Sequence, residues 1–375
     1  GLSLINYKKV FMEKKEKRTG EAKLMKGNEA FAEAAIRADI DAYFGYPITP
    51  QSEVLEYLER EIPNRHGLVL QAESEVASIN MVYGAAGAGA RVMTSSSSPG
   101  ISLMQEGISY IAAAQLPCLI ANVVRGGPGL GTIQPSQGDY FQATKGGGHG
   151  DYHLIVLAPS SVQEMADFVF DGFRLAEKYR NPVMILSDGA LGQMMEKVIL
   201  PEEGSLPKTT PAWATTGKKK EREHNVITSL FIQPEEMEQV NLRLQEKYKA
   251  IQSEVRYEEI QTEDAEILLV AFGLSSRICQ KTVDLAREKG IKVGLLRPIT
   301  VYPYPYARLN ELASQVEFML TVEMNAGQMV EDVRLAVEGK VPVHFIGRMG
   351  GMILSPEDIL HKLESVHESH NAVNV

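Results

Sequence analysis

The stretch AYFGYPITPQSEVLEYLEREIPNRHGLVLQAESEVASINMVYGAAGAGARVMT, residues 42–94, contains the pattern that decides the fold. Its short apolar runs are typical of buried strands and lie at residues 42–46, 68–70 and 92–94. Between them, apolar or small side chains recur at helical spacing over residues 50–61 and 74–88. Strands that alternate with helices in this way build a parallel sheet covered by helices on both faces.

The same alternation continues on both sides of this stretch. An alanine-rich segment with helical spacing precedes it at residues 28–39. The segments that follow it are predicted strands at 118–124, 154–157 and 183–186 and predicted helices at 102–114 and 162–179. Together they predict one α/β unit over residues 24–200.

A change in composition separates this unit from a second one. Residues 201–262 begin with prolines, threonines and a basic run, and then show a charged helical pattern, so we expect a linker with a bridging helix. Residues 263–375 again alternate apolar strands with helices and predict a second α/β unit. We expect two three-layer units with mainly parallel sheets, and residues 1–23 as a flexible arm or an expression remnant.

Composition excludes several classes of function. The net charge is -10 with both signs mixed along the chain, which argues against a nucleic-acid-binding face. The two cysteines, Cys118 and Cys279, lie in apolar runs and are interpreted as core residues. Two thiolates cannot hold an iron–sulfur cluster, which usually takes four. No apolar stretch approaches the ~20 residues that span a membrane, and the polar N-terminus lacks a signal peptide, so we expect a cytoplasmic protein.

Ligands of parallel α/β sheets collect beyond the carboxyl ends of the strands, where loops enter helices. The first such loop is GYPITPQSE, residues 45–53. Thr49 followed by Pro50 is typical of a helix start, with a hydroxyl cap and proline as the first helical residue. Thr49 either caps the helix alone or also contacts a ligand, since exposed amides there favour an anion.

The second loop places Glu73 and Glu75 where a strand gives way to a helix. A carboxylate in the first turn stabilises a helix electrostatically, which accounts for either residue alone. The helix that follows is almost entirely small or apolar, so a carboxylate at its start is partly desolvated and suited to proton transfer. The two interpretations carry equal weight at this point.

Arg125 leaves an apolar strand and enters the glycine-rich loop RGGPGLGT. An arginine there either pairs bidentately with a ligand carboxylate or forms an ordinary salt bridge. The remaining loop, TSSSSPG at residues 94–100, lacks the G-x-S-x-G elbow of serine hydrolases and offers only a polar cradle. The tyrosine- and proline-rich residues 301–307 are interpreted as a rigid interface turn.

The runs YPITP, LQAESEVASINMVYGAAGAGARVMTSSSSPG and VVRGGPGLGT, followed by QGDYFQATKGGGHGD, resemble the alpha subunit of 2-oxoacid:ferredoxin oxidoreductases. Within that family the chain is most similar to the 3-methyl-2-oxobutanoate (2-oxoisovalerate) type. The resemblance covers residues 24 to the C-terminus. It implies that the first unit is a thiamine diphosphate pyrimidine-binding domain and the second a transketolase C-terminal-like domain.

The resemblance also assigns roles to single residues. Glu75 matches the glutamate that hydrogen-bonds N1′ of the cofactor's aminopyrimidine ring, a bond that favours the tautomer able to take a proton from the thiazolium C2. Thr49 matches a contact to substrate and cofactor, with Pro47 and Ile48 beside the cofactor, and Arg125 matches the partner of the substrate carboxylate. Glu73 is expected to support these residues without touching the cofactor or the substrate itself.

Parts that such an enzyme needs are missing from the sequence. No G-D-G motif for the diphosphate and Mg²⁺ occurs, and the string Ser187–Asp188–Gly189 lacks the asparagine that should follow. The resemblance therefore implies a beta subunit with the diphosphate–Mg²⁺ site, small ferredoxin-like and gamma subunits with the iron–sulfur clusters, and ferredoxin as electron acceptor. The substrates it implies are a 2-oxoacid, here branched-chain, and coenzyme A.

Three alternatives stay open on sequence grounds. The chain could serve a 2-oxoglutarate or a pyruvate enzyme of the same family, because residues of the side-chain pocket are not identifiable. It could instead be a non-catalytic scaffold subunit that kept the fold. A third alternative is another thiamine enzyme, such as a transketolase, which carries the diphosphate motif on the same chain or a close homologue.

Overall fold

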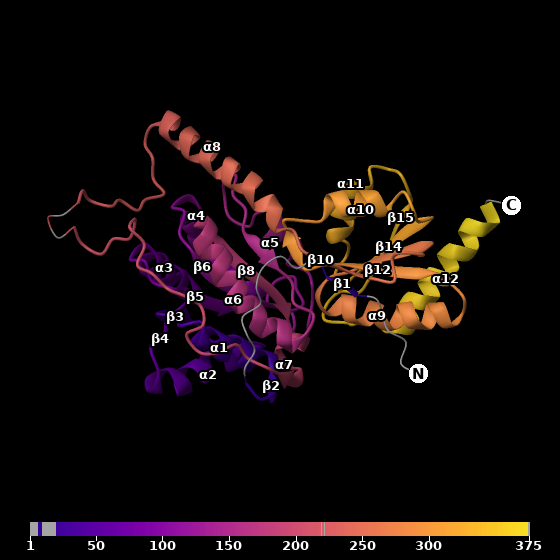
Figure 1. The fold of residues 1–375 in the computed structure, drawn as a ribbon, viewed down its shortest axis with the longest axis horizontal. Helices are drawn as coiled ribbons and strands as arrows, with labels where there is room; N and C mark the ends of the chain where they lie inside the picture. The colour runs from indigo at the N-terminus through magenta and orange to yellow at the C-terminus, as the bar shows by residue number, and fades with distance from the viewer. Residues whose placement is uncertain (1–6, 10–19, 219, 221, 374–375) are drawn as a thin grey trace.

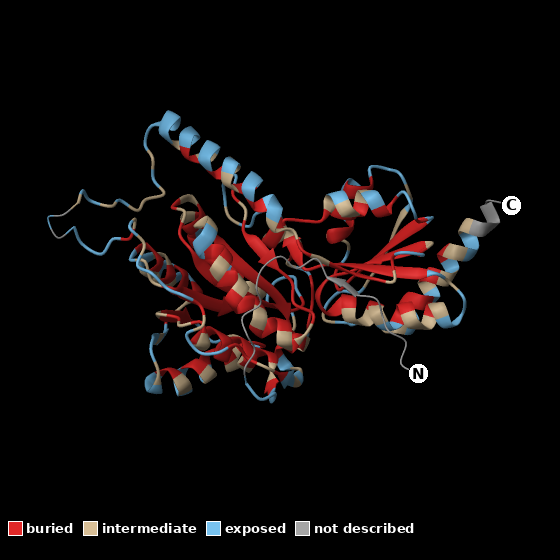
Figure 2. Ribbon diagram, viewed as in Figure 1, coloured by how far each residue is buried: buried red, intermediate tan, exposed pale blue. Residues whose placement is uncertain are grey.

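The structure is a computed structural model that describes residues 7–9, 20–218, 220 and 222–373. Two α/β bodies lie side by side along its longest axis, one built on a seven-stranded sheet and the other on a six-stranded sheet (Figure 1). Both sheets are mainly parallel and covered by helices, which confirms the predicted fold class. The inner strands of both sheets are buried, whereas the segment before helix α8 (Pro234–Ile251) is largely exposed (Figure 2).

The first sheet has the strand order β13-β7-β8-β6-β5-β3-β4. Its six parallel strands are β3 (Ala42–Gly45), β4 (Leu68–Gln71), β5 (Val92–Ser96), β6 (Cys118–Val124), β7 (Ile155–Leu157) and β8 (Pro182–Asp188). The crossovers from β3 to β4 and from β4 to β5 run in opposite directions along the sheet, so right-handed connections place their helices on opposite faces. The central strands are buried on both faces because of this arrangement.

The helices of this body form two layers. Helices that pack together on one side are α1 (Gly27–Arg37), α2 (Ser52–Glu61) and α6 (Val162–Tyr179). On the other side, α3 (Glu75–Gly87) packs against α4 (Ser98–Ala113), which α8 also contacts. The short helix α5 (Tyr140–Thr144) follows a long loop after β6, whereas α7 (Gly189–Gln193) follows β8 directly, with Asp188 as its N-cap. A separate two-stranded sheet pairs β2 (Lys23–Lys26) with β9 (Met195–Val198).

The second sheet has the order β1-β10-β12-β11-β14-β15. Its parallel strands are β11 (Ile267–Val270), β12 (Val293–Pro298), β14 (Phe318–Glu323) and β15 (Val343–Gly347). Its helices are α9 (Gly273–Glu288), α10 (Tyr306–Leu312), α11 (Met329–Val337) and α12 (Pro356–Val373). The antiparallel strands β10 (Tyr257–Ile260) and β1 (Tyr7–Lys9) extend one edge, so part of the segment expected to be an arm pairs with the sheet.

The expected interface turn at residues 301–307 is only partly correct. Thr300–Tyr302 forms strand β13, which pairs antiparallel with β7 and so adds an edge strand to the first sheet. Pro303 follows this strand directly, and a proline is tolerated there because one side of an edge strand needs no ladder partner. The second half of the chain therefore completes the sheet of the first half.

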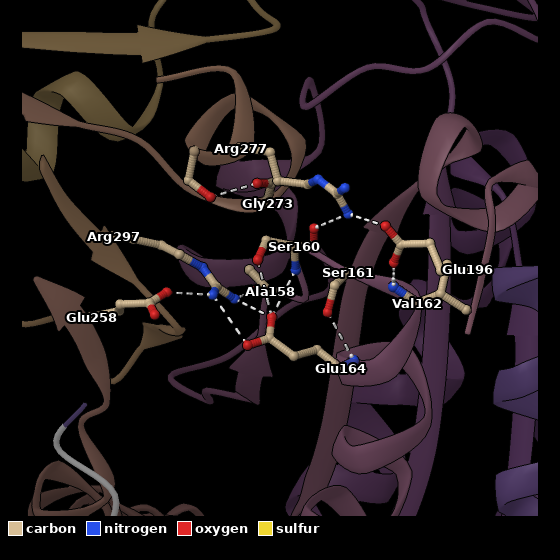
Figure 3. Close-up of polar contacts among 11 residues, drawn as sticks. Ala158, Ser160, Ser161, Val162, Glu164, Glu196, Glu258, Gly273, Arg277 and Arg297 are labelled. Atoms are coloured by element: carbon tan, nitrogen blue, oxygen red, sulfur yellow. Dashed lines mark hydrogen bonds and ion pairs between the residues drawn. The ribbon is translucent and has the colours of Figure 1, made fainter. Parts of the chain in front are cut away.

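Ion pairs, one of them buried, join the two bodies beside β13. The guanidinium of Arg297 on β12 donates to Glu164 of α6 and, at 2.9 Å, to Glu258 of β10 (Figure 3). Arg277 of α9 donates to the carbonyl of Ser160 and, at 2.7 Å, to Glu196 (Figure 3). The Arg297–Glu164 pair is buried, and removing one member would leave an uncompensated charge, so this contact resists separation of the bodies.

Cys118 and Cys279 are both buried with unpaired thiols, as the sequence predicts for core residues. Burial raises the pKa of the Cys118 thiol to about 12, which keeps it uncharged. Among the residues that the structure describes, no helix is long and apolar enough to cross a membrane.

Candidate active site

The carboxyl ends of four adjacent strands, β6, β5, β3 and β4, bring the predicted loops to one edge of the first sheet. Thr49 follows β3, Glu75 follows β4, the serine-rich loop follows β5 and Arg125 follows β6. Because parallel strands end at the same edge, loops from distant parts of the sequence become neighbours. The structure thus brings together the three residues that the sequence singled out.

The turn that carries Thr49 differs from the expected helix start. Helix α2 begins at Ser52 with Gln51 as its N-cap, so Thr49 does not cap it. The amide of Gln51 instead donates to the carbonyl of Ile48 at 3.0 Å and closes a separate turn. The carbonyl of Pro50 accepts from the side chain of Asn28 at 2.7 Å, and therefore Pro50 stands outside the helix.

This turn is held from several sides, and its outer residues face outward. Pro47 and Thr49 are exposed and Ile48 is partly exposed. Beneath them, the hydroxyl of Ser95 donates to Oε1 of Gln51 at 2.6 Å and also contacts the hydroxyl of Tyr43 at 2.8 Å. The turn is therefore a rigid support with an accessible outer surface.

Glu75 opens helix α3, and Ser74 caps that helix by accepting from the amide of Ala77 at 3.2 Å. The Glu75 side chain is 6% exposed and packs against Gly100 in the first turn of α4. A methyl group at position 100 would lie 2.7 Å from Oε1 of Glu75 and 2.0 Å from Oγ of Ser96. Only glycine therefore leaves room for this carboxylate.

The surroundings of Glu75 are polar but not saturated. Within the described part of the chain, no group donates a hydrogen bond to its carboxylate. The hydroxyl of Ser96 beside it is buried and likewise lacks a partner among the described residues. Buried polar groups are normally paired, so a carboxylate and a hydroxyl of this kind suit a ligand that brings its own polar atoms.

Arg125 is 8% exposed and connects two loops. Its Nη1 donates to the carbonyl of Thr49 at 3.0 Å, and its Nη2 donates to the carbonyl of Leu130 at 2.8 Å. The hydroxyl of Ser98 accepts from the Arg125 amide at 3.1 Å and fixes its main chain. The Nε atom is buried without a partner in the described residues. Arg125 therefore has a structural role that the sequence did not reveal, with N–H groups left over.

Sequence reasoning missed Asp139, which lies behind Ser98. Its carboxylate accepts from the side chain of Asn122 at 2.8 Å. Burial raises the pKa of Asp139, opposed by hydrogen bonds from Ser98 and Asn122. The available signal was Asn122 itself, because a polar residue in the apolar run CLIANVV requires a buried partner. Glu73, expected to stand behind the contacts, is exposed.

The residues present fit one half of a thiamine cofactor better than the other. Glu75 in its glycine-lined niche is suited to a ring nitrogen, and the outer face of residues 47–49 is accessible to the ring. Across the described residues, no group of three or more His, Cys, Asp or Glu side chains is arranged to hold a metal ion. A diphosphate is normally held through Mg²⁺ by carboxylates and carbonyls.

Fold and site together define a two-bodied α/β protein whose ligand edge lies at the carboxyl ends of the first parallel sheet. The chain belongs to the pyruvate flavodoxin/ferredoxin oxidoreductase family. The family's thiamine diphosphate-binding model matches residues 33–264, and the core domain II model of pyruvate:ferredoxin oxidoreductase matches residues 265–359. The family resemblance stated from the sequence is confirmed.

Two relatives match over nearly the whole chain. Ketoisovalerate oxidoreductase subunit VorB of Methanothermobacter marburgensis is 52% identical over 93% of this chain and 99% of its own length. The 2-oxoglutarate synthase subunit KorA of Methanocaldococcus jannaschii is 38% identical over 90% of this chain and 98% of its own length.

Two of the solved structures that match this chain illustrate its fold. One is the 2-oxoglutarate:ferredoxin oxidoreductase from Magnetococcus marinus with 2-oxoglutarate, coenzyme A and succinyl-CoA bound, at 27% identity and a TM-score of 0.83. The match covers 92% of this chain, which spans 65% of that solved chain. A split-gene transketolase, an inactive beta4 tetramer, matches at 13% identity with a TM-score of 0.57 and shows the fold alone.

Proposed function

We propose that this chain is the alpha subunit of a 2-oxoacid:ferredoxin oxidoreductase. The complex oxidatively decarboxylates a branched-chain 2-oxoacid to its acyl-CoA and carbon dioxide, and electrons pass to ferredoxin. The observation that carries this proposal is the carboxylate of Glu75, buried in a niche that only Gly100 permits, in a region matched by a thiamine diphosphate-binding model. When bound, the cofactor supplies a carbon nucleophile and an electron sink.

Glu75 is the proton-handling residue of this chain. Its carboxylate would hold a proton at N1′ of the bound aminopyrimidine ring, and a ring held in this way can adopt the imino tautomer, whose 4′-nitrogen is basic. The niche between α3 and α4 excludes water from this bond, since Glu75 is only 6% exposed. Pro47, Ile48 and Thr49 would flank the ring from the turn after β3.

Arg125 binds the carboxylate of the 2-oxoacid in this proposal. Two of its nitrogens already donate to the carbonyls of Thr49 and Leu130, which fixes the plane of the guanidinium. A planar fork held in this way loses little freedom when its remaining N–H groups meet a carboxylate. Thr49 lies on the exposed side of the same turn, so it can contact both substrate and cofactor.

The site would be shared with a second polypeptide, a beta subunit with the diphosphate–Mg²⁺ site. Large apolar side chains are exposed around the edge, which is unusual unless another chain covers them. They are Tyr46, Leu70, Val76, Leu103, Leu130 and Ile133. Leu130, next to Arg125 in the glycine-rich loop, is 81% exposed and is the most open of them. We place the beta subunit on this rim.

The iron–sulfur clusters that transfer electrons belong to further small subunits. So does the sequence that longer relatives carry in addition to the part matched by this chain. The two cysteines of this chain are both buried, and they lie far apart in the sequence. They cannot ligate a cluster. The 2-oxoglutarate oxidoreductase subunit KorA of Mycobacterium tuberculosis is longer, and its match to this chain covers 53% of it. We infer that the rest of such chains corresponds here to a separate gamma subunit, beside a ferredoxin-like subunit.

The choice of a branched-chain substrate rests on the relatives. A ketoisovalerate oxidoreductase subunit is 52% identical to this chain, whereas the 2-oxoglutarate synthase subunits are at most 38% identical. The test is to purify the co-expressed complex and measure viologen reduction with coenzyme A and a panel of 2-oxoacids. We expect kcat/KM to be highest for 2-oxoisovalerate. A preference for 2-oxoglutarate or pyruvate would refute the substrate assignment and leave the family unchanged.

A further inference from the structure

Gln137 stands out because it belongs to the first body in sequence and bonds almost entirely to the second. It lies 12 residues after Arg125, counted along the chain, and is 4% exposed. Its side-chain Nε2 donates to the carbonyl of Phe272 at 2.8 Å. Its Oε1 accepts from the hydroxyl of Ser275 at 2.8 Å and from the amide of Met324 at 3.0 Å. Both ends of the side-chain amide are therefore used.

The main chain of Gln137 is bonded to the same partners. Its amide donates to the carbonyl of Met324 at 2.9 Å, and its carbonyl accepts from the side chain of Asn325 at 2.9 Å. Next to it, the hydroxyl of Ser136 donates to the carbonyl of Met324 at 3.2 Å. A buried residue with all its polar groups paired in this way has a single position, because any shift leaves several groups unsatisfied.

These partners lie at a particular point of the second sheet. Phe272 comes just after β11 and Met324 just after β14, and these two parallel strands are neighbours. The space beyond the carboxyl ends of adjacent parallel strands is where open α/β sheets usually bind ligands. Here the Gln137 side chain fills this space. A methyl group added to Gly273, at the start of α9, would lie 3.1 Å from Nε2 of Gln137.

From Gln137 the chain leads directly back to Arg125. Pro135 forms an isolated β-bridge with Arg125, and the amide of Gly126 donates to the carbonyl of Gln134 at 2.9 Å. Residues 126–134 are therefore a closed loop whose two ends are tied together at Arg125. A movement of Gln137 would be passed through Pro135 to the base of this loop.

We infer that Gln137 is a positioning residue, which uses the ligand edge of the second sheet to hold the glycine-rich loop and with it the guanidinium of Arg125. This inference rests on the proposed role of Arg125 in binding the 2-oxoacid carboxylate. Gln137 itself touches neither substrate nor cofactor in this account. The second body thereby supports the substrate site through Gln137.

Other contacts between the bodies provide a matched control. Arg277 also joins the second body to the first, through the carbonyl of Ser160 and the carboxylate of Glu196 (Figure 3). Neither of these two hydrogen bonds reaches residues 125–135. Loss of Arg277 should weaken the junction between the bodies without releasing the loop.

The test compares Gln137→Leu and Arg277→Ala in the co-expressed complex. Leucine fills a similar volume but makes none of the three side-chain hydrogen bonds. We expect Gln137→Leu to raise the KM for the 2-oxoacid about tenfold, which corresponds to one lost well-placed interaction, with the KM for coenzyme A within about twofold. Amide hydrogen exchange over residues 126–134 should be faster in Gln137→Leu and unchanged in Arg277→Ala.

Two results would overturn the inference. One is an unchanged exchange rate over residues 126–134 in Gln137→Leu, and the other is equal changes of both KM values. If the Gln137→Leu complex does not assemble, Ser275→Ala serves instead, because it removes a single hydrogen bond to Oε1 of Gln137. Amide hydrogen exchange over residues 126–134 should then become faster, but by less than in Gln137→Leu. Arg125→Leu, measured in parallel, separates the two proposals: if it leaves the 2-oxoacid KM unaltered, the role of Arg125 fails, while the exchange data still decide the anchoring by Gln137.

Discussion

The carboxyl edges of the two parallel sheets have the same architecture and are used in opposite ways. At the edge of the first sheet, the carboxylate of Glu75 and the hydroxyl of Ser96 lie buried without protein partners in the described chain, and the rim is apolar and exposed. At the edge of the second sheet, Gln137 fills the corresponding space with every polar group bonded. The fold therefore offers two ligand edges, and side-chain chemistry decides which one stays available.

This comparison predicts the largest effect at Glu75. Glu75→Gln removes the group that holds the proton at the cofactor ring, so 2-oxoacid-dependent viologen reduction by the complex should fall by about 10²–10⁴-fold. Glutamine has nearly the same size, and thermal unfolding should change little. Glu73→Gln is the control, because Glu73 is exposed, and it should retain normal activity. Near-normal turnover in Glu75→Gln would contradict the assignment of the active site to the carboxyl edge of the first sheet.

A smaller loss of activity is expected from a change at Gly100, the glycine that leaves room for the Glu75 carboxylate. Gly100→Ala places a methyl group against Glu75 and Ser96, and a displacement of about 1 Å of a catalytic group can cost about 10²-fold in rate. Gly84→Ala is the matched control in α3, since no atom lies within 4 Å of its added methyl group. Replacing that helical glycine should raise the free energy of unfolding by about 0.5–1 kcal/mol and leave turnover unaltered. Equal activities of the two variants, measured by viologen reduction, would contradict the niche.

At Arg125 the comparison predicts a selective change in binding. Arg125→Leu should raise the KM for the 2-oxoacid about 10–100-fold, because truncating one member of a desolvated charged pair costs about 2–5 kcal/mol, part of which falls on kcat. The KM for coenzyme A should move far less. Arg125→Lys keeps the charge but not the planar fork that reaches Thr49 and Leu130, so it should show an intermediate value. Parallel rises of both KM values in steady-state kinetics would exclude the carboxylate role.

The smallest predicted effect concerns the exposed rim. Leu130→Asp introduces a charge at a side chain that is 81% exposed in the chain and that the proposal places against the beta subunit. The dissociation constant for the beta subunit should rise about tenfold, in line with the loss of one apolar contact at an interface. Leu335→Asp, on the exposed side of α11, provides a control with a similar exposure of 65%. Sedimentation or light scattering that finds no difference between these variants would place the interface elsewhere.

The strands of both sheets were largely predictable, because buried parallel strands are short runs of apolar residues. The run CLIANVV became β6 with the expected bounds. Strand β10 was missed because its sequence YEEI contains Glu258 and Glu259, which are buried and accept hydrogen bonds from Arg297 and Arg308. Charged residues that are paired by distant arginines hide a strand from any local pattern.

The candidate site shows the same limit. The sequence indicated Glu75 and Arg125 because they stand out at strand ends, but it misjudged Thr49 as a helix cap. The turn at Thr49 is determined by Asn28, 22 residues before the carbonyl of Pro50 that it binds. Gln137 escaped notice because its partner Met324 lies 187 residues away. Contacts across such separations arise only from the tertiary fold.

The central claim is that the cofactor's ring binds to this chain while its phosphates are held by another. The most direct test is calorimetric titration of thiamine diphosphate into the folded, isolated chain and into the co-purified complex, each with and without Mg²⁺. The account predicts tight, Mg²⁺-dependent binding to the complex and none that depends on Mg²⁺ in the isolated chain. Tight Mg²⁺-dependent binding by the isolated chain would contradict it.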